Sequence, residues 1–142
     1  MRVDFYQLSR DPAEALIPRL AEQTLKAGER LLVVTADPEQ AARISQALWA
    51  HKPESFLAHG ADGEGSEERQ PILLSDAVET SNGARYLIFA DGEWRDPPET
   101  CERAFLLFGE ATIAAARERW RALPPGERNF WKQAAKGWEK VA

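Results

Sequence analysis

The sequence predicts an α/β fold in which a mostly parallel sheet is flanked by helices. Two observations support this prediction. Short segments rich in β-formers alternate with helical repeats in the first half of the chain, and this order implies crossover connections between parallel strands. Residues 31–35 form a continuous run of apolar and β-branched residues, typical of a strand buried on both faces. The 142 residues suffice for one domain, which we expect to span residues 1–142.

The first strand and the first helix are predicted before residue 29. Residues 3–8 form a short segment that is rich in β-formers, and this predicts a strand. In Asp11-Pro12-Ala13-Glu14, the aspartate is placed to cap the free amides of a helix, and the proline suits its first turn. Apolar residues then recur with helical spacing up to Gly28, which can end a helix because glycine adopts positive φ readily.

The second strand, over residues 31–35, leads into a second helix. The segment Asp37-Pro38-Glu39-Gln40 repeats the same helix-start chemistry. An apolar stripe then continues to about Trp49 or His51, where we expect this helix to end.

The rest of the chain alternates loops with short elements. Residues 60–70 are polar, acidic and Gly-rich and predict a loop. Beyond Pro124-Pro125-Gly126, the residues through Trp131 and Trp138 predict a last short helix and an aromatic tail. Between these regions the pattern predicts strands over 71–74, 86–90 and 104–108 and a helix over 110–123.

Composition favours the cytoplasm. No apolar stretch is long enough for a membrane span, and the charged N-terminal segment is unlike a signal peptide. A single cysteine, Cys101, excludes an internal disulfide and a cysteine-based zinc site. His51 and His59 are too few for a histidine metal cluster. We therefore expect no bound metal and no membrane association.

The sequence lacks the signals of a nucleotide site. The turn after the first strand, Ser9-Arg10-Asp11-Pro12, has no glycine that would let the backbone approach a pyrophosphate. The Gly-rich stretch at residues 60–66 lacks a lysine and carries carboxylates that repel phosphate. We therefore predict a Rossmann-like sheet without a dinucleotide fingerprint, with no cofactor and no catalytic activity. A nucleotide-dependent small α/β enzyme stays open as the alternative.

The charge of the chain is unevenly spread. The formal net charge of −5 argues against nucleic acid as a general partner, because phosphate neutralisation needs a basic surface. Residues 117–140, however, carry seven basic and three acidic side chains, a local charge of +4, which leaves −9 for the rest. This basic end favours a local anionic partner, and a nucleic-acid binder that uses it is a second alternative.

One aromatic cluster lies at the predicted end of the second helix. Trp49 is followed a few residues later by Phe56 and His59. A helix end next to an aromatic strand start predicts a hydrophobic patch for a partner protein.

A second cluster lies on the predicted helix near residue 120. Arg117, Trp120 and Arg121 are three and four residues apart and share one side of a helix, which Ile113 extends by a turn. Two guanidiniums beside an indole suit a ligand that offers carboxylates and an aromatic ring. The same spacing also fits a buried stripe that includes Trp120, and periodicity does not separate the two interpretations.

Several segments of the chain resemble one bacterial protein family in order and spacing. They include the opening strand, Ala47-Leu48-Trp49 with residues 54–59, and the stretches 71–74 and 116–121. The endings Phe130-Trp131-Lys132-Gln133 and Gly137-Trp138-Glu139-Lys140 follow the same pattern. In this combination the chain resembles the chi subunit of bacterial DNA polymerase III over nearly its whole length.

The resemblance implies a non-catalytic adaptor of the DNA polymerase III holoenzyme. Such an adaptor links the clamp loader to the acidic C-terminal tail of single-stranded DNA-binding protein, which ends in phenylalanine and a free carboxylate. The family's basic, aromatic and basic residues for this tail match Arg117, Trp120 and Arg121. A further family lysine falls on Ile113, and Lys132 or Arg128 is expected to compensate for its absence.

The resemblance also implies a second binding surface. The family's aromatic patch for the psi subunit of the clamp loader, or for a helicase that competes for the same surface, matches Trp49 and Phe56, with His59 beside them. The implied contact with DNA is indirect.

Overall fold

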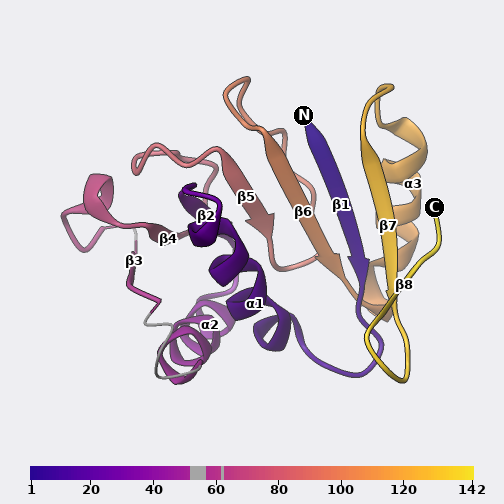
Figure 1. The fold of residues 1–142 in the computed structure, drawn as a ribbon, viewed down its shortest axis with the longest axis horizontal. Coiled ribbons are helices and arrows are strands. Elements are labelled where there is room, and N and C mark those ends of the chain that lie inside the picture. Colours follow the sequence, from indigo (N-terminus) through magenta and orange to yellow (C-terminus); the bar gives the residue numbers. More distant parts are fainter. Residues whose placement is uncertain (52–56, 62) are drawn as a thin grey trace.

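One eight-stranded sheet organises the chain in a computed structural model, which describes residues 1–51, 57–61 and 63–142. The strand order is β3-β4-β2-β5-β6-β1-β7-β8 (Figure 1). From β3 at one edge through to β7, each strand pairs in parallel with its neighbours in this order, and only β8 pairs antiparallel, with β7. The predicted mostly parallel α/β sheet is therefore confirmed. The strands are β1 (Arg2–Gln7), β2 (Leu31–Val34), β3 (His59–Ala61), β4 (Ile72–Ser75), β5 (Tyr86–Phe89), β6 (Arg103–Phe108), β7 (Arg128–Gln133) and β8 (Trp138–Lys140).

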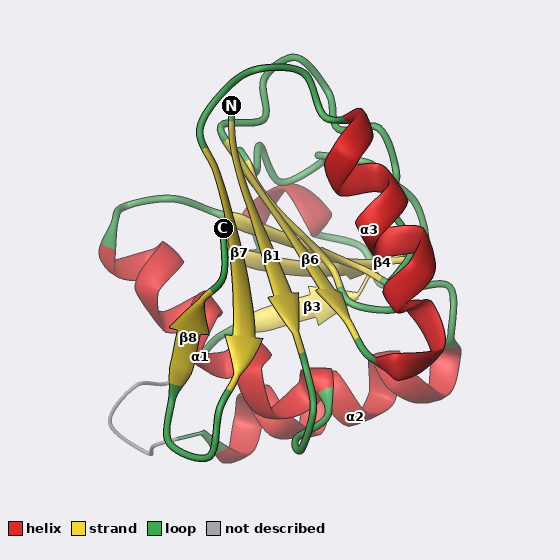
Figure 2. Ribbon diagram, turned by 90° about the vertical axis from the view of Figure 1, so that its right-hand side faces the viewer, coloured by secondary structure: helices red, strands yellow, loops and turns green. Residues whose placement is uncertain are grey.

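Helices cover the two faces of the sheet unequally. Helices α1 (Ala13–Lys26) and α2 (Pro38–Ala50) lie on one face, and α3 (Ile113–Ala122) lies on the other, behind β1 and β7 (Figures 1 and 2). Two short 3-10 turns, Glu67–Arg69 and Glu110–Thr112, complete the helical elements of the described residues. None of the described helices has the length and apolar character needed to cross a membrane.

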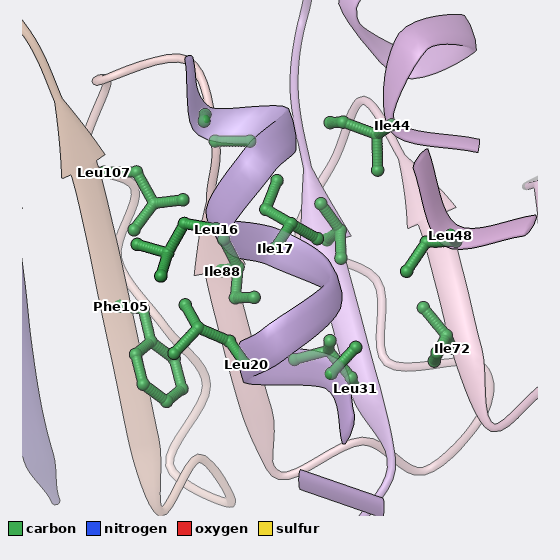
Figure 3. Packing of buried hydrophobic residues seen from close by; sticks show 14 of the residues in the cluster. Leu16, Ile17, Leu20, Leu31, Ile44, Leu48, Ile72, Ile88, Phe105 and Leu107 are labelled. Carbon is green, nitrogen blue, oxygen red and sulfur yellow. The ribbon is translucent and has the colours of Figure 1, made fainter. Parts of the chain in front are cut away.

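Each face of the sheet has its own buried cluster. On the α1 side, Leu16 and Ile17 pack with Leu31 and Ile88, and all four side chains are buried (Figure 3). On the α3 side, the phenylalanines of four strands pack together with Ala116, which is the buried residue of α3. Because both faces of β2 are buried, this strand is apolar throughout, as residues 31–35 indicated.

The two helix starts behave differently. At α2 the prediction is confirmed, because the Asp37 carboxylate accepts the Glu39 backbone N–H at 2.9 Å. At α1 the predicted cap is wrong: Pro12 holds the cap position without a side-chain hydrogen bond. The Asp11 carboxylate instead accepts a hydrogen bond from the side-chain amide of Gln133 at 2.8 Å.

The predicted C-terminal helix and aromatic tail are wrong. Residues 128–133 form β7 beside β1, with Phe5 opposite Phe130, and the chain then turns back as β8. The physical reason is the free edge of β1, because pairing there buries Phe130 against Phe5 in the α3-side cluster. Gly137 supports the hairpin between β7 and β8 with a φ of 72°.

Two further boundaries differ from the sequence prediction. The loop predicted over residues 60–70 contains part of edge strand β3 and the 3-10 turn at Glu67–Arg69. The helix predicted over residues 110–123 begins as a 3-10 turn and becomes α-helical at Ile113. Both elements are short, so neither shows enough periodicity to be recognised in the sequence.

Candidate functional site

Trp120 on α3 belongs partly to the core. Its ring packs edge-on against Phe5 and Phe130, at centroid distances of 5.3 and 5.4 Å. Arg128 lies over the ring, with its guanidinium carbon 4.7 Å from the centroid, and donates a hydrogen bond to the Trp120 carbonyl at 2.8 Å. The indole is therefore half-buried, and the arginine that lies on it comes from β7 rather than from its own helix.

The two arginines predicted beside Trp120 point to solvent. Arg117 and Arg121 are exposed and lie one helical turn apart. Neither has a carboxylate within ion-pair distance among the described residues. Ile113 is half-buried and packs on the same cluster as Trp120.

Lys132 lies on the face of the sheet that α3 covers. It is exposed and follows Phe130 by two residues on β7, so the alternation of the strand directs both side chains to that face. The α3 side of the molecule thus presents Arg117 and Arg121 from the helix and Arg128 and Lys132 from β7, and of these Arg128 lies over the half-buried Trp120.

A hollow that the sequence did not predict lies along the other flank of α3. It has a volume of about 660 Å³ and lies between the helix and the connection from β5 to β6. Trp94 forms one wall, with its ring 5.2 Å from that of Phe89, and the Arg119 guanidinium lies 5.8 Å from the Trp94 centroid. In the sequence, the feature that could have indicated this hollow is Trp94 itself, because a large apolar ring is unexpected in a polar, Pro-rich connection.

An ion pair fixes the rim of this hollow. Burial alone would raise the pKa of Asp91, but hydrogen bonds from Arg95 and from the amides of Ala36 and Glu93 outweigh that effect and lower it. The carboxylate meets Arg95 at 2.8 Å and the Ala36 N–H at 2.9 Å. Asp91 therefore holds the ends of β5 and β2 together and serves the structure of the rim.

The structure brings Trp49 and His59 together at the far end of the sheet. Trp49 is 56% exposed at the end of α2, and its ring lies 4.6 Å from that of His59. His59 Nδ1 lies 2.9 Å from the Leu57 carbonyl, and Nε2 lies 2.8 Å from the Ser45 hydroxyl. The carbonyl needs a donor, so in the neutral ring Nδ1 carries the proton and Nε2 accepts from Ser45. Phe56 lies outside the described residues.

The backbone amides of the turn after β1 are bonded to a side chain of β7. The side-chain oxygen of Gln133 accepts the backbone N–H groups of Ser9, Arg10 and Asp11 at 3.1, 2.9 and 3.2 Å. These three amides form the kind of concave donor set that α/β nucleotide-binding proteins direct at phosphate. Here the chain's own amide fills it. The described residues also contain no group of His, Cys, Asp and Glu side chains suited to a metal ion.

Comparison with known proteins gives a consistent result. The family model described as DNA polymerase III chi subunit, HolC, matches residues 1–125. The DNA polymerase III subunit chi of Escherichia coli strain K12 is 30% identical over 93 residues, which cover 61% of this chain and 63% of that protein. The subunit chi of Pseudomonas aeruginosa is 34% identical over 76 residues, covering 51% and 52%.

The extent of these matches is partial. The chain spans between 50% and 63% of the length of the curated relatives that it matches. Strands β7 and β8, and with them Arg128 and Lys132, lie beyond the residues that the family model matches.

Proposed function

The chain belongs to the DNA polymerase III chi subunit family, and on that premise we propose that it is a non-catalytic accessory subunit of this polymerase in DNA replication. The observation that carries the proposal is the family match over residues 1–125. The relatives are named as subunits of DNA polymerase III. The turn after β1, filled by Gln133, supports a role other than nucleotide chemistry.

The proposed task is to link the clamp loader to the acidic C-terminal tail of single-stranded DNA-binding protein. Arg117 and Arg121 support it, because guanidinium forks bind carboxylates strongly and these two have none among the described residues. Arg128 and Lys132 add positive charge on the same side of α3, where Ile113 supplies none. In this proposal the tail carboxylates pair with these cations.

The aromatic ring at the end of the tail has two possible receptors. On the Trp120 flank, the indole edge-packs in the core and carries Arg128, so the incoming ring contacts the exposed part of Trp120. On the other flank, the hollow beside Trp94 offers an aromatic wall and the cation of Arg119. We favour the Trp120 flank because Arg128 lies over the indole and the exposed Arg117, Arg121 and Lys132 add positive charge on the α3 side of the sheet.

Titration with a peptide that carries the acidic tail, ending in phenylalanine with a free carboxylate, tests this function. Separate exposed ion pairs contribute little, so we expect a dissociation constant in about the micromolar range that rises with salt. The matched control is the same peptide with a C-terminal amide, which we expect to bind more weakly. Equal binding of the acid and the amide would contradict the proposed recognition of the chain end.

The second surface is proposed to bind another protein of the replication machinery. Trp49 and His59, together with Phe56, would contact a psi-like clamp-loader subunit or a helicase. The exposure of Trp49 supports a protein partner, because tryptophan is enriched at interface hot spots.

We propose that contact with DNA is indirect and that residues 1–142 act as one cytoplasmic domain. Filter binding of single-stranded DNA at low salt tests the indirect contact, because tight binding would favour the nucleic-acid alternative.

A further inference from the structure

A hollow of about 570 Å³ lies at the carboxyl ends of β2 and β4. The two strands are neighbours, but their connections leave on opposite faces of the sheet. The connection from β2 enters α2, whose Ile44 belongs to the α1-side cluster, whereas the residues after β4 pack through Val78 and Ala84 into the α3-side cluster. Parallel sheets characteristically bind ligands in the crevice at such a divergence.

One wall of this hollow is aromatic and held in place. Trp49 lines it and leans on His59, which is fixed from both ring nitrogens by Ser45 and Leu57. The small side chains of Ala41 and Ala42 on α2 leave the space in front of this wall open. The hollow therefore presents a large ring at its mouth without needing a rearrangement of the backbone.

The other side of the hollow is rich in hydrogen-bond acceptors. Glu64 and Asp76 line it, and its lining contains no lysine or arginine among the described residues. The Asp76 carboxylate has no ion pair or hydrogen bond within the described part of the chain. Ser75 is only 7% exposed, and its hydroxyl oxygen accepts one hydrogen bond of 3.2 Å, from Ala77, so it can accept another.

These observations select the chemistry of the occupant. Two carboxylates repel phosphate and acidic peptides and attract a cation. An aromatic wall beside them favours a planar cation, since guanidinium stacks on indole and sheds its hydration more easily than ammonium does. Five donor N–H groups in a fork match several acceptors placed around one space.

We propose that this hollow binds an arginine side chain of a partner protein, with the guanidinium stacked on Trp49 and paired with Asp76 and Glu64. The inference deepens the proposed second surface and rests on it for the identity of the partner as a protein. It is independent of the tail site, because α3 lies on the opposite face of the sheet (Figure 2). The two surfaces thus have opposite charge preferences, one for carboxylates and one for a cation.

The direct test is an NMR titration of the full chain with Nα-acetyl-arginine amide. Citrulline amide, acetylated in the same way, is the matched neutral probe because it has nearly the same shape without the charge. We expect saturable shifts at the Trp49 indole and at Ser45 and His59, with arginine bound at least about tenfold more tightly than citrulline. Equal affinity for the two probes, or no saturable shift at these residues up to about 50 mM arginine amide, would overturn the proposal.

Variants test whether the two carboxylates of the hollow cause the preference for arginine without affecting the stability of the fold. In the double variant Glu64→Gln and Asp76→Asn we expect the preference for arginine to disappear while the melting temperature stays unchanged. The matched control is Glu93→Gln with Glu118→Gln, which removes the same charge at the hollow beside Trp94 and should keep the preference. Retention of the preference in the first variant would contradict the assignment. A tail peptide that still binds to α3 in either case would leave the tail proposal intact.

Discussion

Gln133 at the end of β7 and Asp11 in the turn after β1 are joined by two hydrogen bonds, in one of which Gln133 accepts and in the other of which it donates. The Gln133 side-chain oxygen accepts the Asp11 backbone N–H at 3.2 Å, and its amide nitrogen donates to the Asp11 carboxylate at 2.8 Å. Because Ser9 and Arg10 donate to the same oxygen, one side chain of β7 satisfies three consecutive amides before α1. This relationship ties the C-terminal hairpin to the start of the chain.

Replacing Gln133 tests this tie. In Gln133→Ala we expect a loss of about 1–2 kcal/mol in the free energy of unfolding, because the three exposed amides must turn to water instead. Faster amide hydrogen exchange in β7 and β8 should accompany the loss. The control is Lys132→Ala, an exposed neighbour on the same strand, for which we expect a change within about 0.5 kcal/mol. Equal stability of the two variants would contradict this role for Gln133.

Charge reversal on α3 separates the two possible receptors for the tail. In Arg117→Glu with Arg121→Glu we expect tail-peptide affinity to fall by at least about tenfold, since attraction becomes repulsion, with little change in melting temperature. Arg119→Glu reverses a charge on the other flank of the same helix and should have a smaller effect. If Arg119→Glu weakens binding more, the hollow beside Trp94 is the receptor. Isothermal titration calorimetry measures all three proteins.

Trp120 is expected to act on stability as well as on binding. Trp120→Ala should cost about 2–4 kcal/mol, because the ring fills space against Phe5 and Phe130. Trp120→Phe retains an aromatic ring there and should recover much of that loss. Binding should therefore be compared between the wild type and Trp120→Phe. A wild-type unfolding curve for Trp120→Ala would show that the ring does not support the core.

Asp4 is expected to be the most sensitive polar position in the sheet. Its side chain is fully buried and accepts hydrogen bonds from Arg103 at 2.8 Å and Asn129 at 3.0 Å, so it links β1 to β6 and β7. Removing one partner of a buried ion pair leaves the other uncompensated, and we expect Asp4→Ala to cost about 3–5 kcal/mol. Chemical denaturation measures this cost, and a loss below about 1 kcal/mol would be inconsistent with the network.

The thiol of Cys101 gives a pH-dependent prediction. Burial raises the pKa of Cys101 from its usual 9.0 to about 11, so the folded state holds its proton more tightly than the unfolded state does. Its contribution to stability is therefore complete below pH 9 and is lost as the pH rises toward about 11. Cys101→Ser should reduce the alkaline slope of stability over that window. In native protein at pH 8, thiol reagents should react only slowly.

The sequence predicts those elements whose determinants are local. Asp37 caps the helix that follows it, and Gly28 takes positive φ where the first helix ends. Asp11 has the same local appearance as Asp37, but a side chain more than a hundred residues away takes its carboxylate. The strand at residues 128–133 escapes prediction for the same reason, because the partner that makes it a strand is the edge of β1.

In the candidate site too, the features with local determinants could be predicted and those set by distant residues could not. Helical spacing places Arg117 and Arg121 together, and both are exposed as a binding role requires. Spacing cannot decide how Trp120 divides between core and surface, because the rings of Phe5 and Phe130 that determine this lie on other strands. Trp94 and the hollow it lines arise from a connection without periodicity, so only the unusual tryptophan in a polar, Pro-rich segment marks them in the sequence.

The position of β1 affects how the chain folds as it is made. Arg2 pairs with Arg103 on one side and Val3 with Arg128 on the other, so both neighbours of β1 are synthesised long after it. Until the second half has been translated, the nascent β1 has neither of its neighbours available to cover its apolar residues. Completion of the sheet therefore awaits the emergence of β7 and β8, and we expect the long sequence separation of these pairs to slow folding.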